Sequence, residues 1–267
     1  MGLGTADDDA KAEHKNHGVY FVPGLHRGLR VLEIVAAARR PMSITEIAAE
    51  LELTRSAVFR LTYTLKHMGF LEEEQFKLFT LGARVLNIGF AFLASKSIIE
   101  IAGPELEALR DETRVSAHLA IRDDRDVLYL SCVQTRSGFL SNMNVGSRVP
   151  AYASPMGWLL LSGLSSKEIT DLHRREGFQP LTDKTPRSIK ALITTAKASG
   201  KRGYVISRGI MEMGGSSLSA PITNRRDETI AAIDISGPDS AFDVDQLEGR
   251  YLAAVRAAAR RISEKVG

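Results

Sequence analysis

Four basic side chains stand within one short stretch of the chain that contains no acidic residue. The stretch from 53 to 71 reads LTRSAVFRLTYTLKHMGFL and contains Arg55, Arg60, Lys66 and His67. Arginine in such a setting can bind phosphate oxygens or the acceptor edge of guanine. The stretch is therefore either an ordinary amphipathic helix or a surface that lies against a polyanion.

Two short helices joined by a tight turn are expected to position these side chains. Ser43 and Glu46 have the spacing of a capping box, which begins a helix. Thr54 is an N-cap candidate for the next helix, and Gly69 is its expected stop. This arrangement over about 43–68 is typical of a helix-turn-helix, although an αα-hairpin that contacts another protein has the same pattern.

The two faces of the second helix favour the nucleic-acid interpretation. At 100° per residue, Val58, Leu61, Leu65 and Met68 share one side and should face the core. An opposite face that carries aromatic rings beside arginine, with no acid, is unusual for a helix that is only solvated. It suits insertion into the major groove of DNA. That face carries Ser56, Phe59, Arg60, Tyr63 and His67.

Segments on both sides complete the expected DNA-binding domain. A preceding helix should bury a stripe of Leu25, Leu29, Leu32 and Val35. The later segment FLEEEQFKLFTLG alternates around a polar turn, which predicts a two-stranded wing with Lys77 near its tip. The candidate DNA contacts are Ser43, Thr45, Thr54, Arg55, Ser56, Ala57, Phe59, Arg60, Tyr63 and Lys77.

Length and composition limit the class of protein. A chain of 267 residues suits two modest domains, and a net charge of +3 is too small to identify a partner. The single cysteine excludes a disulfide within the chain and suits a reducing cytoplasm. We find no membrane-spanning run and no signal peptide, and we expect residues 1–20 to be a disordered tail. The spacing of candidate ligands predicts no metal site, and we expect no cofactor.

The rest of the chain has the pattern of a connector followed by a mixed domain. We place the DNA-binding domain at 21–82 and a linker helix at 83–110, interrupted at Gly103 and Pro104. Over 111–267, strand-like runs such as VSAHLAI and TIAAIDIS alternate with helical stretches. This predicts an α+β fold.

Two of the predicted strands carry polar side chains on one face. Ser217 and Ser219 share a face of their strand, and Asp234 and Ser236 share a face of the next one. A carboxylate in an apolar strand must be hydrogen-bonded, so Asp234 lies either at an exposed sheet edge or in a polar cavity. An exposed alternating strand is the alternative for each run.

A third segment, YASPMGW, has the features of an anion site. Ser154 can cap a helix that begins at Pro155, which would leave the N–H groups of Met156 and Gly157 free.

Taken together, these motifs resemble the IclR (isocitrate lyase regulator) family. The likeness covers GLHRGLRVLEIV, MSITEIAAELELTRSAVFRLTYTLKHMGFLEEE, FTLGARVLNIG, VGSRVPAYASPMGWLLLS, GYVISRGIMEMGGSSLSAPI and AAIDISGP. It implies a winged helix-turn-helix, a linker helix and a GAF-like α/β effector domain, in dimers or tetramers that bind palindromic operator DNA and sense a metabolite. The effector contacts that it implies are Tyr152, Ser154, Met156, Gly157, Trp158, Ser207, Ser217, Ser219, Asp234 and Ser236.

Several positions depart from the pattern of the family. Relatives often carry an acid at Ser207, cysteine at Ser217, serine or another small residue at Asp234, histidine at Tyr152 and lysine at Trp158. The segment GSRVPAYASPMG resembles the subgroup that regulates aromatic-acid catabolism. We therefore expect a small organic, aromatic acid or derivative as effector rather than a small keto acid.

An enzyme is the alternative from another functional class. A hydrolase could use the C-terminal pocket, with the helical hairpin as a protein-contact module. The chain has no G-x-S-x-G elbow, no Gly-rich phosphate loop and no metal-spaced cluster. His118 is interpreted as a hydrogen-bonded strand histidine rather than a general base. We expect a ligand-responsive transcriptional regulator, acting as a repressor, and not an enzyme.

Overall fold

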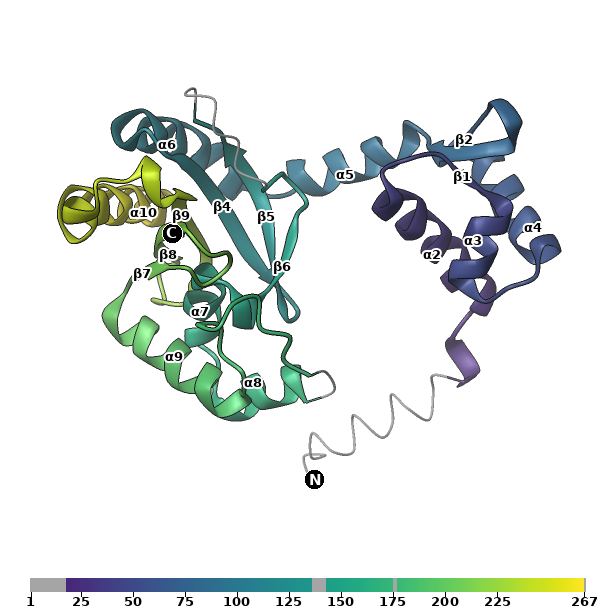
Figure 1. The fold of residues 1–267 in the computed structure, drawn as a ribbon. Coiled ribbons are helices and arrows are strands. Elements are labelled where there is room, and N and C mark those ends of the chain that lie inside the picture. Colours follow the sequence, from purple (N-terminus) through teal and green to yellow (C-terminus); the bar gives the residue numbers. More distant parts are fainter. Residues whose placement is uncertain (1–17, 136–142, 175–176, 267) are drawn as a thin grey trace. The chain divides into compact units, whose positions relative to one another are not determined.

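The computed structural model describes residues 18–135, 143–174 and 177–266 (Figure 1). They form two compact units, divided between Phe92 and Leu93. Of the expected tail, residues 1–17 lie outside the described part, and 18–20 form a helical turn. Each unit has its own hydrophobic core, and the fold is α+β.

The first unit is a small helical domain with a three-stranded antiparallel sheet of order β1-β3-β2. The short turn η1 (Gln75–Lys77) joins its two longer strands as a wing. The elements in chain order are α2 (Pro23–Ala38), β1 (Met42–Ser43), α3 (Ile44–Leu51), α4 (Arg55–His67), β2 (Leu71–Glu74), β3 (Leu78–Leu81) and α5 (Arg84–Ala94), which crosses the division.

The core of the first unit differs from the expected stripes at three positions. Leu25 and Leu29 of α2 are exposed, because the buried side of this helix runs through Val31 and Val35 instead. Met68, expected in the core, is 43% exposed because it caps the C-terminus of α4. The core is formed by Val31, Val35, Met42, Ile47, Ala48, Val58, Leu71 and Phe79.

A buried threonine lies where the sequence predicts no core residue. Thr62 is fully buried on the same side of α4 as Val58. Its hydroxyl bonds the carbonyl oxygens of Val58 and Phe59, both at 3.1 Å. Because its own helix satisfies the hydroxyl, burial leaves no unpaired polar group.

The predicted linker contains a break, but not at Gly103 and Pro104. The chain breaks instead between α5 and α6 (Ser97–Thr113), and Pro104 lies inside α6. Pro104 is on the exposed side of α6, whereas Ala102, Leu106 and Leu109 are buried in the core of the second unit. Packing on that side keeps the helix continuous through a residue that usually interrupts one.

The second unit is built on one six-stranded antiparallel sheet of order β6-β5-β4-β9-β8-β7. After α6 its elements are β4 (Ser116–Asp123), β5 (Asp126–Val133), β6 (Arg148–Pro150), η2 (Ala151–Ala153), α7 (Pro155–Ser162), α8 (Ser166–His173), α9 (Ile189–Arg202), β7 (Val205–Arg208), β8 (Gly215–Thr223), β9 (Thr229–Pro238) and α10 (Leu252–Val266).

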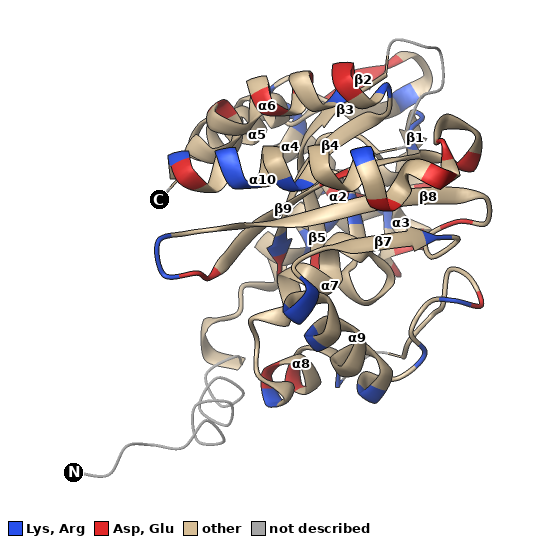
Figure 2. Ribbon diagram, turned by 90° about the vertical axis from the view of Figure 1, so that its left-hand side faces the viewer, with Lys and Arg blue, Asp and Glu red and all other residues tan. Residues whose placement is uncertain are grey.

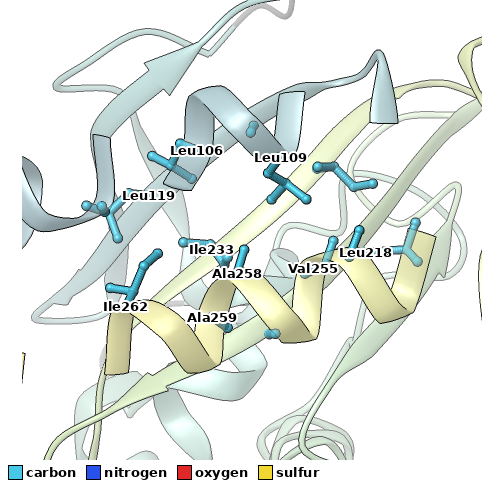
Figure 3. Close-up of a cluster of buried hydrophobic side chains, with 14 of the residues drawn as sticks. Leu106, Leu109, Leu119, Leu218, Ile233, Val255, Ala258, Ala259 and Ile262 are labelled. Carbon is cyan, nitrogen blue, oxygen red and sulfur yellow. The ribbon is translucent and has the colours of Figure 1, made fainter. Parts of the chain in front are cut away.

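Helices cover both faces of this sheet. On one face α6 and α10 pack over apolar strand residues, including Leu119, Leu218 and Ile233 (Figure 3). On the other face α7 packs against the strands, with α9 beside it. The alternation expected for β8 is confirmed, since Leu218 and Ala220 lie in the α6–α10 core. Ser217 and Ser219 therefore point towards the α7 side.

Among the described helices, none by itself is long and apolar enough to cross a membrane. Only α5 and α6 added together, across the break between them, reach that length.

Candidate functional site

The helix-turn-helix begins with a capping box that forms as expected. The Ser43 hydroxyl accepts a hydrogen bond from the Glu46 backbone N–H, and the Ser43 backbone N–H donates to the Glu46 carboxylate at 2.8 Å. Hydrogen bonds from the backbone and side chain of Ser43, with Arg40 nearby, lower the pKa of Glu46 to about 2. The carboxylate is therefore charged at neutral pH and holds the start of α3.

The turn between the helices fixes where α4 starts. Glu52 adopts the left-handed conformation (φ 53°) and ends α3. Thr54 then caps α4, its hydroxyl accepting from the Ala57 N–H at 3.3 Å. At the other end Gly69, at φ +75°, follows the C-cap Met68. Both ends of the predicted second helix are confirmed.

The face of α4 that sequence periodicity predicts is exposed as a set. Phe59 is 55% exposed and Tyr63 is 64% exposed, with their ring centroids 6.3 Å apart. No acidic residue lies within α4, and the nearby Glu73 of β2 is paired with Lys66 at 2.6 Å. Figure 2 shows the acidic residues of β2 in red. We call this surface the basic-aromatic face of α4, and it consists of Arg55, Ser56, Phe59, Arg60 and Tyr63.

The remaining candidate DNA contacts have different environments. Ser43 donates its hydroxyl hydrogen to Glu46 at 2.8 Å, so the structure uses it for capping. Ala57 is half-buried, whereas Thr45 and Lys77 are exposed. Phe76, which was not predicted as a contact, lies beside Lys77 at the wing tip and is 89% exposed. An aromatic residue in an otherwise polar turn was the available signal.

A cavity of about 410 Å³ in the second unit is large enough for a small organic molecule. Three predicted effector residues line it, namely Ser207, Ser217 and Ser236. The hydroxyl oxygens of Ser207 and Ser217 are hydrogen-bonded at 3.0 Å across β7 and β8. The other lining residues are Tyr129, Met143, Arg148, Val149, Pro150, Leu181, Ile210, Met211, Glu212, Gly215, Ser216 and Gly237.

None of these twelve was predicted as an effector contact, although most lie in the segments that resemble the IclR family. Tyr129 is an exception because it lies on β5, outside those segments. Burial and the nearby Asp234 raise the pKa of Tyr129 well above its usual value, so its hydroxyl stays protonated. Burial likewise raises the pKa of Cys132 to about 12, which keeps that thiol unreactive.

The expected anion site at the start of α7 is not open. Ser154 caps α7 as predicted, but its hydroxyl accepts the Gly157 N–H at 3.4 Å, so this N–H is not free. A Cβ on Gly157 would lie 2.2 Å from the Ala151 carbonyl oxygen. The start of the helix is thus packed against η2, and Met156 is buried in the core beneath it.

Two of the implied effector contacts, Trp158 and Tyr152, lie in different places. Trp158 is only 6% exposed, and its indole N–H donates to the Tyr152 carbonyl at 2.9 Å. The ring of Tyr152 lines a separate hollow beside α8. Neither is among the residues that line the cavity described above.

Asp234 lies neither at a sheet edge nor in the lining of that cavity. It is 3% exposed on central strand β9, and its carboxylate lies 2.8 Å from Nδ1 of His118 on β4. Ser236 Oγ lies 3.3 Å from the same nitrogen. The pairing confirms His118 as a hydrogen-bonded strand histidine. Ser219 is directly opposite Asp234 and fully buried, so both belong to the interior behind the cavity.

The chain is similar to known transcriptional regulators along most of its length. The chain matches the bacterial transcriptional regulator IclR C-terminal model over 90–264 and the IclR helix-turn-helix model over 24–75. It is 28% identical to the Pca regulon regulatory protein of Pseudomonas putida, over 92% of this chain and 84% of that protein. It is 29% identical to the transcriptional repressor IclR of Escherichia coli, over 92% and 90% of the two chains.

Solved structures have the same fold. A transcriptional regulator from Rhodococcus sp. RHA1 superposes with a TM-score of 0.79 at 29% identity, covering 92% of this chain and 98% of that one. An IclR homolog from Microbacterium hydrocarbonoxydans, solved in complex with 4-hydroxybenzoate, gives 0.77 at 22% identity over 91% and 98%. The curated relatives are named as regulators and repressors, which supports the regulatory interpretation over the enzymatic one. The C-terminal family model alone covers more than half of this chain. This chain therefore belongs to the IclR family of DNA-binding bacterial transcriptional regulators.

Proposed function

We propose that this regulator represses a catabolic operon by binding a palindromic operator as a homodimer or homotetramer, and that it responds to a small aromatic acid. The observation that carries the proposal is the basic-aromatic face of α4, an exposed helix surface with two arginines and two rings and no acid. Groove-binding helices read bases and phosphates with such side chains.

The wing adds a second point of contact with DNA. Strand β2 carries Glu72, Glu73 and Glu74, so the side of the wing repels phosphates. Its tip instead presents Phe76 and Lys77, both exposed and both in the left-handed conformation. An apolar ring beside a cation suits the minor groove, where such rings wedge against base steps.

Exposed apolar side chains on two helices of the first unit support self-association. Leu25 and Leu29 of α2 and Leu86, Ile88 and Phe90 of α5 are each more than half exposed. Exposed apolar side chains in such number indicate a protein interface. A second copy of the chain would cover them and supply the second α4 that a palindrome with half-sites about one helical turn apart requires.

The lining of the cavity fits an aromatic acid. Tyr129, Val149 and Ile210 provide apolar walls, and Ser207 and Ser217, which bond each other, leave one hydroxyl hydrogen for a carboxylate. Arg148 also lines the cavity, but its guanidinium is paired with Asp123 and Asp126. The relative from Pseudomonas putida is named for the Pca regulon, and the homolog from Microbacterium hydrocarbonoxydans binds 4-hydroxybenzoate. Effector binding then changes operator affinity by a coupling energy of about 1–3 kcal/mol.

A mobility-shift titration tests the proposal. The full-length protein is titrated onto the intergenic DNA upstream of its own gene, with and without hydroxybenzoates, their amides and an aliphatic acid of similar size. We expect a sequence-specific complex that hydroxybenzoates weaken by roughly 5- to 150-fold. Binding no tighter than to scrambled DNA contradicts operator recognition. A response to the aliphatic acid alone contradicts the aromatic effector.

A further inference from the structure

The lining of the cavity of about 410 Å³ includes a tyrosine whose hydroxyl the protein itself does not use. Tyr129 lies on β5 and is 1% exposed, with its ring edge-on to His118 at a centroid distance of 5.7 Å. No described residue forms a hydrogen bond with its hydroxyl. A buried tyrosine usually has a partner for this group. A molecule bound in the cavity could supply the missing one.

The Tyr129 hydroxyl is not sealed inside the core. Four side-chain polar atoms of the described residues are fully enclosed without a hydrogen bond, and they belong to His118, His173, Ser199 and Ser219. A hydroxyl that lacks a partner and is not among these atoms keeps some accessible surface. Since Tyr129 lines the cavity and is otherwise buried in the core on the α7 side, the cavity is the space that its hydroxyl reaches.

The serine hydroxyls of the lining, unlike that of Tyr129, each have a partner. Ser207 and Ser217 bond each other at 3.0 Å, which leaves one hydrogen for a ligand. Ser216 donates to an aspartate of the turn after β9, and Ser236 Oγ lies 3.3 Å from a histidine nitrogen. The serines are thus tied to the protein before a ligand arrives.

The charged groups of the lining do not replace Tyr129 as a donor. The guanidinium of Arg148 is paired with Asp123 at 2.6 Å and with Asp126 at 3.2 Å. Glu212 is exposed, and its carboxylate only accepts hydrogen bonds. In the described lining, Tyr129 is therefore the side-chain donor that no other residue occupies.

The charge near Tyr129 decides which group of a ligand it can bind. Burial, and after it the negative charge of Asp234, raise the pKa of Tyr129 well above its usual value. Its hydroxyl therefore stays protonated and can donate. The same buried negative charge disfavours a ligand carboxylate at this point. A neutral oxygen, such as that of a hydroxyl group on an aromatic ring, accepts the hydrogen bond without this repulsion.

We propose that Tyr129 selects hydroxylated aromatic acids, by donating a hydrogen bond to the hydroxyl oxygen on the ring of the ligand. The carboxylate of the ligand then binds elsewhere in the cavity, where the Ser207–Ser217 pair has its free hydrogen. This inference rests on the proposed aromatic effector and adds the residue that recognises its hydroxyl group.

Benzoate and its hydroxy and amino derivatives form a matched set of probes, because they share the ring and the carboxylate. Titration calorimetry of the full-length protein gives each affinity. We expect the best of the three hydroxybenzoates to bind roughly 2- to 10-fold more tightly than benzoate. The aminobenzoate substituted at the same position should bind no more tightly than benzoate, because its nitrogen donates well but accepts poorly. An aminobenzoate that binds as tightly as the hydroxybenzoate overturns the donor role of Tyr129.

Tyr129→Phe removes only the hydroxyl, so the preference for the hydroxybenzoate over benzoate should disappear. Ser217→Ala is the matched control, since it alters the same cavity from another strand and should keep that preference. Trp158 fluorescence, from the core that also contains Tyr129, checks that each variant is folded. A preference that survives in folded Tyr129→Phe overturns this inference but not the aromatic effector. Failure of every benzoate to bind the unaltered protein overturns both.

Discussion

The basic-aromatic face of α4 and the cavity lined by Ser207, Ser217 and Ser236 both contain clusters of polar side chains, but the chain assembles them differently. The five residues on α4 come from one helix and are exposed together. The cavity draws residues from β5, β6, β7, β8 and β9. In the first case the helical period places the side chains, whereas in the second the placement depends on what packs over each strand.

The same alternation that places Ser217 in the cavity places Ser219 in the interior. The two share a face of β8, two residues apart, and Ser219 is opposite Asp234 in the register. Because helices cover both faces of this sheet, a polar position on a strand can either line the cavity or be buried in the core, as Ser219 is with no hydrogen-bond partner for its hydroxyl among the described residues. The period of the strand does not distinguish them.

Asp234→Ala tests most strongly whether the second cluster is interior. Removing the carboxylate takes away the 2.8 Å hydrogen-bond partner of the buried His118, so the unfolding free energy of the second unit should fall by about 1–3 kcal/mol. Urea unfolding followed by Trp158 fluorescence measures this, because Trp158 is the single tryptophan and lies in that unit. The double variant His118→Leu/Asp234→Leu should recover much of the loss. Unchanged stability with lost effector binding would make Asp234 a ligand contact after all.

Arg60→Ala tests the surface cluster. Its loss should weaken operator binding by about 1–3 kcal/mol, since a base or phosphate contact of arginine is worth that much. Effector affinity should not change. Arg226→Ala, which removes the same charge from the exposed β8–β9 turn, is the matched control. Fluorescence anisotropy at fixed salt gives the operator affinity of each variant. Equal losses in the two variants would mean that Arg60 contributes only through the net charge of the protein.

Ser217→Ala tests whether the cavity binds through its strand serines. The variant loses the bond to Ser207, and the affinity for 4-hydroxybenzoate as probe should change by about 0.5–1.5 kcal/mol. Operator affinity without ligand should match that of the unaltered protein. Titration calorimetry provides the measurement, with the exposed Ser240→Ala as control. An identical isotherm would place the effector elsewhere.

Acid should loosen the start of α3 before it affects the α4 surface. The folded pKa of Glu46 is about 2, below its ordinary 4.5, so the folded state binds this proton less readily. Its stabilising effect is therefore present above pH 4.5 and is lost as pH falls towards 2. The Ser43 amide resonance should follow that titration. In Glu46→Gln this resonance should not respond over the same range.

Much of the first unit could be predicted because its signals are local. Capping residues, the helical period and the stop at Gly69 each act within a few residues, and they located α3 and α4 correctly. The errors came from tertiary packing. Met68 has the right period for the core but sits at the end of its helix, and Thr62 enters the core because its hydroxyl bonds its own helix.

Less of the second unit could be predicted, because its contacts join distant segments. The sequence indicates that Asp234 needs a partner, but His118 is 116 positions away. Pro104 is a reliable signal for a helix break only where packing does not hold the helix together. The likeness to the IclR family supplied what local rules lack, since three of its implied residues do line the cavity.

The wing tip holds its two central residues at φ 62° and 58°, a conformation that glycine adopts without strain and that phenylalanine does not. Glycine at position 76 would therefore relax the hairpin, and it would also remove the ring. The folded state of the isolated domain gains nothing from a side chain that is 89% exposed. Conformational strain at this turn therefore lowers the stability of the wing, a cost that fits the contact with DNA that we propose for Phe76.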